Sequence, residues 1–440
     1  MSVILKLLRK LNGDIGAEEK FFLASFIMEF EWEITVHLTV RALAERLNLS
    51  PRAVMQATSK LSAGAYLVVN KVSAGQGRPS RSYEIGPAIL ALIEGQSVDS
   101  CPSICEQIIK QLLTCSGELV PEQYTGSCEA TRSNEVGFKQ PPVRKKTDRL
   151  STSNRWLLAV LVSHADKLGV VRGLGMSRLR QLSGLRETTL KLQLNRLVEL
   201  GFIRSQVPGV SSSFFVGAKI STTFYLNLNH PLLGLQIDGC AVLVLHESGF
   251  DRREAFCVKA SSNVQPVIER YFRQLRAEVF NVFCLRLDGY ASYLLASHWN
   301  GLSSPVCPDL THTLQDMISA DLRRPDDKYV YGLIINELDW AVLIEYLGWL
   351  ALERARGVKD LLTRMPVGDF CGAGIELIPT PDQGNGTQIT TVLMEHAPLP
   401  EVSGLVIRYV PPYVCEWYER EDELVAEQRY RFGLLTRPNV

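Results

Sequence analysis

Apolar positions in the first part of this 440-residue chain recur further along it at one constant offset. The matched positions are Leu43 and Leu179, Leu49 and Leu185, Val54 and Leu190, Leu61 and Leu197, Tyr66 and Phe202, and Leu67 and Ile203. In both segments the spacing predicts a short helix, a tight turn, a longer helix and then a strand. The chain therefore contains an internal repeat.

The first copy predicts a helix over Val40–Leu47 and a second helix that begins at Pro51 and stops at Gly64. Asn48 suits the left-handed turn between them, and Ser50 is a good N-cap. The second helix is expected to bury Val54, Ala57 or Thr58, and Leu61, and to expose Arg52, Gln56, Ser59 and Lys60.

Two strands should follow the second helix, over Leu67–Val72 and Ser82–Ile85. The glycine-containing loop between them, residues 73–81, carries Arg78 and Arg81. Guanidinium groups on such a hairpin loop can reach phosphates or the minor groove of DNA.

The second copy predicts helices over Arg155–Ala165, Ser177–Ser183 and Arg186–Leu200, with Gly184 in the turn before the third. Strands are expected from Ile203 and within 220–228. The third helix should point Arg186, Thr188, Lys191 and Asn195 outward. Asn and Lys side chains suit adenine and guanine edges respectively.

Three features of the second copy depart from a simple DNA-binding pattern. Its strand-connecting loop, residues 207–219, carries only Lys219 as a basic residue. Arg180 stands where a small residue usually packs, and Leu192 is an apolar residue on the predicted outward face. We expect a neighbouring domain to contact one or both of these side chains.

Residues 18–90 resemble the winged-helix domain of bacterial transcription regulators, and residues 77–83 resemble its wing. The resemblance implies that the second helix of each pair enters the major groove while the wing touches the DNA backbone. The residues expected to bind DNA are Ser50, Arg52, Gln56, Lys60, Arg78, Arg81, Lys145, Lys146, Arg186, Thr188, Lys191 and Asn195.

The zero net charge of the chain conceals an uneven distribution. Residues 139–234 contain fifteen basic and four acidic side chains, whereas residues 235–440 contain 19 basic and 28 acidic ones. A short basic segment is a candidate footprint for a polyanion. Lys145 and Lys146 lie in the linker 122–153, which is either a solvated connection or a basic arm on phosphates.

The ten cysteines favour no disulfide framework in a cytoplasmic chain. Cys101, Cys105, Cys115 and Cys128 cluster in the sequence, but they lack the close Cys-x-x-Cys pairs of most zinc sites. A helix over Pro102–Leu113 would give Cys105 an ordinary core position. We therefore predict no metal site and no cofactor, while a cluster such as some iron–sulfur regulators carry stays an alternative.

Residues 235–440 predict a mixed α/β domain. Strands are expected over Cys240–His246, Val282–Asp288, Gly374–Ile378, Ile389–Met394 and Leu405–Val410. Helices are expected over Val264–Val279, Asp309–Leu322, Asp339–Arg364 and Tyr413–Arg431. Gly384-Asn385-Gly386 predicts a hairpin turn.

The same region contains little that indicates catalysis. Neither Gly-x-Ser-x-Gly nor His-Glu-x-x-His occurs in it. Asp382 and Glu395 have the order of a metal-dependent nuclease, but Ala397 stands where the nuclease pattern requires lysine. We predict a non-enzymatic region for dimerisation, partner binding or ligand sensing.

The sequence thus predicts an α+β protein in four segments: residues 1–121 and 154–234 as winged-helix domains, the linker 122–153, and the C-terminal domain 235–440. The absence of an 18-residue apolar run predicts no membrane span. The expected function is sequence-specific binding of double-stranded DNA by a cytoplasmic, homodimeric bacterial transcription regulator. The alternatives are a plasmid or mobile-element replication initiator and a protein-binding scaffold.

Overall fold

The computed structural model combines helices and strands, as the predicted α+β class requires. It describes residues 1–12, 15–72, 80–95, 99–114, 150–210, 215, 220–233, 240–248, 253–254, 256–257, 266–304, 308–324, 336–364, 374–378, 387–395, 406–410, 414–418, 421–432 and 434–435. Two compact units are present. The N-terminal unit comprises Met1–His164, Ser177–Leu200 and His230–Leu235, and the C-terminal unit comprises Ala165–Met176, Gly201–Asn229 and Gln236–Val440.

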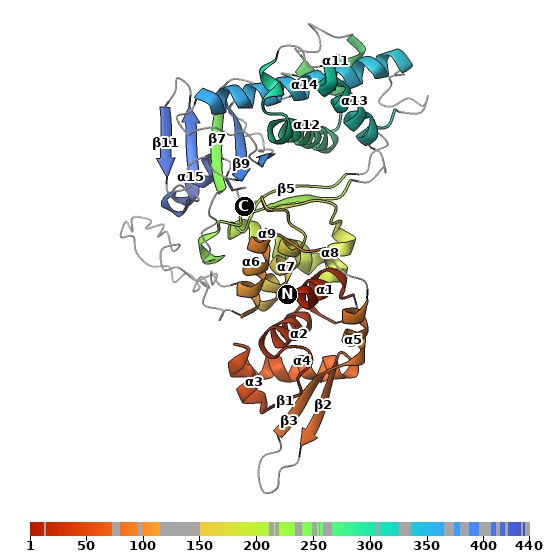
Figure 1. Cartoon of the computed structure of the whole chain (residues 1–440), viewed down its shortest axis with the longest axis vertical. Coiled ribbons are helices and arrows are strands. Elements are labelled where there is room, and N and C mark those ends of the chain that lie inside the picture. Colours follow the sequence, from red (N-terminus) through yellow and green to blue (C-terminus); the bar gives the residue numbers. More distant parts are fainter. Residues whose placement is uncertain are drawn as a thin grey trace, which may run out of the picture. The chain divides into compact units, whose positions relative to one another are not determined.

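The N-terminal unit is mainly helical (Figure 1). Its helices are α1 (Ser2–Lys10), α2 (Ala17–Phe30), α3 (Val40–Arg46), α4 (Pro51–Ala63), α5 (Pro87–Glu94), α6 (Ser103–Thr114), α7 (Thr152–Ser163), α8 (Met176–Ser183), α9 (Glu187–Glu199) and the 3-10 turn η2 (Pro231–Leu233). Strands β1 (Val36–Leu38), β2 (Leu67–Val72) and β3 (Ser80–Ile85) form an antiparallel sheet in the order β1-β3-β2.

Helices α2, α6 and α7 pack against one another and form the core of this unit. Phe21, Phe22 and Phe26 of α2 and Trp156 of α7 are fully buried there. The Trp156 indole Nε1 donates a 3.2 Å hydrogen bond to the Leu182 carbonyl near the end of α8. The two copies of the repeat therefore share one helical core within this unit.

Basic side chains satisfy carbonyl oxygens that the helix C-termini leave without partners. Lys6 of α1 donates to the carbonyls of Ile93 and Gly95 at the end of α5, and Arg9 donates to that of Ser163 at the end of α7. Buried Lys20 of α2 donates to Gln181 and Leu182 at 2.7 and 3.2 Å, at the end of α8. Arg155 Nε donates to Leu112 of α6 at 2.8 Å. Each cation also opposes the negative end of a helix dipole.

The internal repeat predicted from the apolar pattern appears in the order of elements. The series α2, β1, α3, α4, β2, β3 recurs as α7, β4 (Val170–Val171), α8, α9, β5 (Ile203–Val207), β6 (Thr223–Leu226). The second sheet has the order β4-β6-β5, which repeats β1-β3-β2. The offset that relates the apolar positions also maps both ends of α4 onto both ends of α9. Helices α7 and α9 belong to the N-terminal unit and strands β5 and β6 to the C-terminal unit.

The C-terminal unit contains a mixed five-stranded sheet in the order β11-β10-β7-β9-β8. Its strands are β7 (Cys240–Ser248), β8 (Ile375–Ile378), β9 (Thr387–Glu395), β10 (Val406–Val410) and β11 (Val414–Tyr418), with β7 and β10 parallel. Its helices are α11 (Pro266–Gln274), α12 (Ala277–Ser297), α13 (Pro308–Asp321), α14 (Glu337–Arg364) and α15 (Ala426–Arg431), with the 3-10 turns η3 (Gly301–Ser303) and η4 (Glu421–Glu423).

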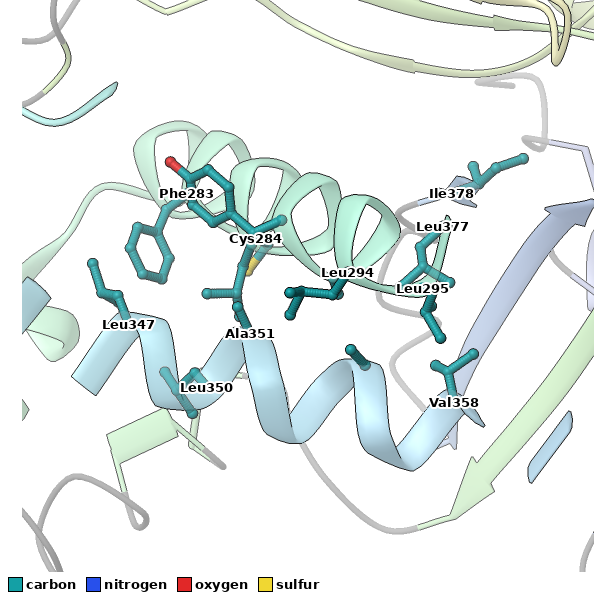
Figure 2. Packing of buried hydrophobic residues seen from close by; sticks show 14 of the residues in the cluster. Phe283, Cys284, Leu294, Leu295, Leu347, Leu350, Ala351, Val358, Leu377 and Ile378 are labelled. Atoms are coloured by element: carbon teal, nitrogen blue, oxygen red, sulfur yellow. The ribbon is translucent and has the colours of Figure 1, made fainter. Parts of the chain in front are cut away.

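Helix α12 packs along α14 and also against β8 (Figure 2). Figure 2 shows Cys284 and Leu294 of α12 facing Ala351 of α14, with Leu377 of β8 beside Leu295. All five side chains are buried. This apolar layer is the centre of the C-terminal core.

Two predicted elements of this region are wrong. Val282–Asp288, predicted as a strand, lies inside α12. Buried positions continue on both sides of it, at Val279 and Ala291, with the spacing of a helix, so a short apolar run had hidden a longer helical period. Tyr413–Arg431, predicted as one helix, contains β11, η4 and α15. β11 has the sequence Val-Cys-Glu-Trp-Tyr, whose β-branched and aromatic residues favour a strand, and it pairs with β10.

Other boundaries differ less. The predicted helix Val264–Val279 ends at Gln274, and α12 begins three residues later at Ala277. The remaining strand and helix predictions for the described part of the C-terminal region are confirmed to within a few residues. The hairpin turn predicted at 384–386 lies outside the described residues. The predicted domain boundaries stay a prediction.

A fully buried ion pair in the C-terminal unit joins β5 to η4. Arg204 Nη2 lies 2.7 Å from Glu421 Oε2, and both side chains are no more than 5% exposed. Arg204 also donates to Glu421 Oε1 at 3.0 Å and to the Asn227 side chain at 2.7 Å. Burial makes this contact sensitive to the loss of one partner, because the remaining charge would lie in a low-dielectric core.

We expect Arg204→Met to lower the free energy of unfolding by about 3–5 kcal/mol, since it leaves Glu421 buried and unpaired. The double variant Arg204→Met/Glu421→Leu should lose less free energy of unfolding than the sum of the losses in the two single variants. Urea denaturation measures both. Arg41→Met provides the control, because the Arg41–Glu45 pair is 86% and 70% exposed and should contribute little. Additive losses in the double variant would contradict the coupling.

A second buried carboxylate, Glu376 on β8, contacts Arg172. Burial raises the pKa of Glu376 to about 7 although the Arg172 charge and hydrogen bond lower it. A carboxyl group whose pKa is higher in the folded state favours folding when protonated. Its contribution is therefore present at low pH and is lost as the pH rises from about 4.5 to about 7.

Glu376→Gln, which resembles the protonated group, should leave the stability almost unchanged at pH 5. At pH 8 the free energy of unfolding of the variant should exceed that of the wild type by about 2 kcal/mol, because the wild type must then bury a charge. Thermal or urea unfolding at both pH values measures this difference. An identical difference between the two proteins at pH 5 and pH 8 would show that Glu376 titrates normally.

Candidate nucleic-acid interface

Helix α4 buries one face and exposes the other. Val54, Ala57, Thr58 and Leu61 are buried against the unit, whereas the predicted DNA-binding residues Ser50, Arg52, Gln56 and Lys60 are exposed. The Ser50 Oγ accepts a 3.2 Å hydrogen bond from the Ala53 N–H, so the predicted N-cap is confirmed. Asn48 has a φ of 51°, which confirms its left-handed turn conformation. Local sequence therefore fixes where α4 begins.

The cations of α4 differ in their surroundings. Lys60 Nζ is paired with the buried carboxylate of Glu19 on α2. The hydrogen bond and charge of Glu19 raise the pKa of Lys60. No acidic side chain of the described residues pairs with Arg52. Of these two residues, Arg52 is therefore the better candidate for a phosphate contact.

Helix α9 has the same division between faces. Leu190, Leu194, Leu197 and Val198 are buried, and the predicted DNA-binding residues Arg186, Thr188, Lys191 and Asn195 are exposed. Arg186 is the N-cap residue, and its side chain makes no capping hydrogen bond. The first N–H groups of α9 therefore have no side-chain cap, in contrast to α4.

An exposed charge cluster surrounds the start of α9. Lys191 Nζ lies 2.9 Å from Glu187 Oε1, with both side chains more than 60% exposed. The pKa of Glu187 is lowered by this hydrogen bond and by the charge of Lys191, and also by Arg180. Arg180, on α8, is exposed, and its charge effect on Glu187 places it near the N-terminal turn of α9. Arg180 stands where the pattern predicted a small packed residue, and its place just before the turn is the local signal for its exposed position.

Most described cations of the basic segment 139–234 are buried or bonded to other groups of the protein. Arg155 and Arg204 are buried, Arg172 and Arg196 pair with acidic side chains, and Arg178 donates to Asn12 and to the Arg9 carbonyl. Arg180 and Arg186 are exposed, and within the described ranges no acidic side chain forms an ion pair with either. Among the described cations the charge count therefore overstated the polyanion footprint, and Arg180 and Arg186 are exposed members of it that form no ion pair there.

The structure describes only one of the four remaining residues that were predicted to contact DNA. Arg81 lies on β3, opposite Leu38 of β1 and Lys71 of β2, and is half-buried. Arg78, Lys145 and Lys146 lie outside the described residues. The basic linker ends next to α7, which begins at Thr152.

The arrangement of helices inside the N-terminal unit separates the two exposed faces. Helix α4 packs on α2, α2 packs on α7, and α7 packs on α9. Figure 1 shows α2 and α7 between α4 and α9. One core therefore holds both faces.

The turn between α8 and α9 lies against the start of α2. Gly184 has a φ of 68°, and a Cβ there would lie 2.6 Å from the Ile15 carbonyl oxygen. The Arg178 guanidinium, at 2.9 Å from Asn12 Oδ1, and buried Lys20 hold the same region. These contacts fix the direction in which α9 leaves the turn.

Other chemistries find little support among the described residues. No three His, Cys, Asp or Glu side chains in that part of the chain lie close enough together to hold a metal ion. Cys105 is buried on the inner face of α6, as the helix pattern predicted, whereas Cys115 and Cys128 lie outside the described ranges. None of the described helices combines the length and the apolar character needed to cross a membrane.

Comparison with known proteins finds no matching family model, no matching curated protein and no matching solved structure.

We expect Gly184→Ala to lower the free energy of unfolding by more than the strain of a left-handed residue alone, which costs about 1–2 kcal/mol. The reason is that the substitution adds a clash with the Ile15 backbone to that strain. Gly173→Ala is the matched control, because Gly173 has a φ of 75° but no atom within 4 Å of its Cβ position. Equal losses for the two variants, measured by urea denaturation, would show that the close approach is unimportant.

Proposed function

We propose that this chain binds double-stranded DNA sequence-specifically, with α4 and α9 as the recognition helices of two winged-helix domains. One observation carries the proposal: both helices bury an apolar face and expose a polar face, in the same register of the repeat. A recognition helix needs this division, because its inner face fixes it to the domain while its outer face enters the major groove. The repeated order of helices and strands also supports the proposal.

The start of α9 supplies the phosphate contacts in this proposal. Arg180 and Arg186 are exposed cations, and the N-terminal N–H groups of α9 have no side-chain cap. Cations together with a helix N-terminus suit a phosphate oxygen. Thr188, Lys191 and Asn195, further along the exposed face, then reach base edges.

The first copy and the linker supply further contacts. Arg52 and Gln56 of α4 are exposed and suit a phosphate and a base edge respectively. We assign Arg78 and Arg81 to the wing of the first copy, and Lys145 and Lys146 to a basic arm on the backbone. The lysines would add affinity without sequence preference.

Regulation of transcription is the cellular role that we propose for this binding. A homodimer formed through residues 235–440 would present paired recognition helices to paired half-sites.

Binding of a partner protein is the second candidate function. Leu192 on α9 and Met55 on α4 are exposed apolar side chains on the outward faces, which a protein-binding scaffold would use. The salt dependence of heparin retention separates the two candidates. Steep dependence on salt favours DNA binding, because released counterions dominate binding to a polyanion.

Replacing both Arg180 and Arg186 by alanine should weaken duplex binding and reduce the slope of log K against log salt concentration by about two. Fluorescence anisotropy with labelled duplexes at several salt concentrations measures the slope. Arg196→Ala is the control, because it removes one charge from the same helix at a half-buried position paired with Glu199. The assignment fails if the double variant and the control have the wild-type slope.

A further inference from the structure

The outward face of α9 carries an apolar side chain that the fold does not require. Leu192 is 68% exposed, and the core of the unit is formed by Leu190, Leu194 and Leu197 on the other side of the helix. At the repeat offset Leu192 corresponds to Gln56 of α4, which is also exposed. The first copy thus has a polar side chain at the matching position, and the exposed Leu192 side chain is available for contact with a ligand.

Leu192 lies in the middle of the polar surface described above. Thr188 precedes it by four residues and Asn195 follows it by three, so the three side chains share one face of the helix. All three are exposed. The face begins at the uncapped N-terminus near Arg180 and Arg186, whose charges favour a phosphate backbone over an apolar protein surface.

In the major groove, the 5-methyl group of thymine is the apolar feature of the base edges. A leucine at the centre of a polar recognition face can shield this methyl group from water. An asparagine side chain can form two hydrogen bonds with adenine through N6 and N7. Leu192 and Asn195, one turn apart, would therefore contact neighbouring A·T pairs.

We propose that Leu192 selects thymine by contact with its 5-methyl group, and that Asn195 recognises an adjacent adenine, so that the half-site contacted by α9 contains consecutive A·T pairs. This inference rests on the proposed function of α9 as a recognition helix. It adds the base preference and the residues that determine it.

The experiment uses the full chain and duplexes selected by it from a randomised library. Each thymine of the selected site is replaced singly by deoxyuridine, which lacks only the methyl group. At one or two positions the wild type should lose about fourfold in affinity, the effect expected for one buried methyl group. In Leu192→Ala the same replacements should change the affinity by less than a factor of two.

Two further variants sharpen the test. Leu338→Ala removes a leucine that is 67% exposed on α14, and it should keep the wild-type response to deoxyuridine. Asn195→Ala should relax the preference for adenine at a neighbouring pair while the response to deoxyuridine persists. Both variants change exposed side chains, so normal folding is expected.

The outcomes separate the two proposals. If the chain binds no duplex with an affinity that depends on salt concentration, DNA binding itself is rejected. If the duplexes bind but no thymine position responds to loss of the methyl group, Leu192 does not read thymine. If Leu192→Ala retains the full response, another residue reads the methyl group and the assignment to Leu192 is overturned.

Discussion

The packing of α2 against α7 is the contact on which the proposed interface depends. Each of these helices begins one copy of the repeat, and each carries the longer exposed helix of that copy, α4 or α9. Because α6 packs on both, the two copies share a core within the N-terminal unit. Two independent domains on a linker could adopt many relative positions on DNA, whereas a shared core limits both helices to one arrangement.

Cations in this protein serve two different purposes, and burial decides between them. Lys6, Arg9, Lys20 and Arg155 donate to the last carbonyls of four helices, where they replace hydrogen bonds that water would otherwise supply. A cation used in this way cannot also neutralise a phosphate. The exposed arginines near the start of α9 are different, because within the described residues neither forms an ion pair with an acidic side chain.

The C-terminal unit combines a mixed sheet with long apolar helices. Two ion pairs, buried Arg204 with Glu421 and half-exposed Arg172 with buried Glu376, connect strands or turns that are far apart in sequence. Removing the arginine of either pair would leave a buried carboxylate without that ion-pair partner. The two ion pairs give the unit a defined structure without indicating a reaction.

The sequence by itself determined the elements whose signals are local. The helix pairs, the cap at Ser50, the turns at Asn48 and Gly184 and the inward leucines all follow from spacing and side-chain chemistry within a few residues. The outward positions of Arg52, Arg186 and Asn195 follow from the same periodicity.

Only the tertiary structure decided what distant residues do to these positions. Glu19 lies on a different helix from Lys60 and far from it in sequence, yet its buried carboxylate forms an ion pair with that lysine. Helices α1 and α2 likewise form hydrogen bonds near the turn before α9. One of them holds the guanidinium of Arg178, which is among the cations counted in the basic segment. Segment 282–288 is the opposite case, because the helical period of its buried positions, from Val279 to Ala291, is present in the sequence, and α12 packs against α14. Local sequence specifies which faces are apolar or polar, but the partner of each charge depends on contacts between segments that no local pattern records.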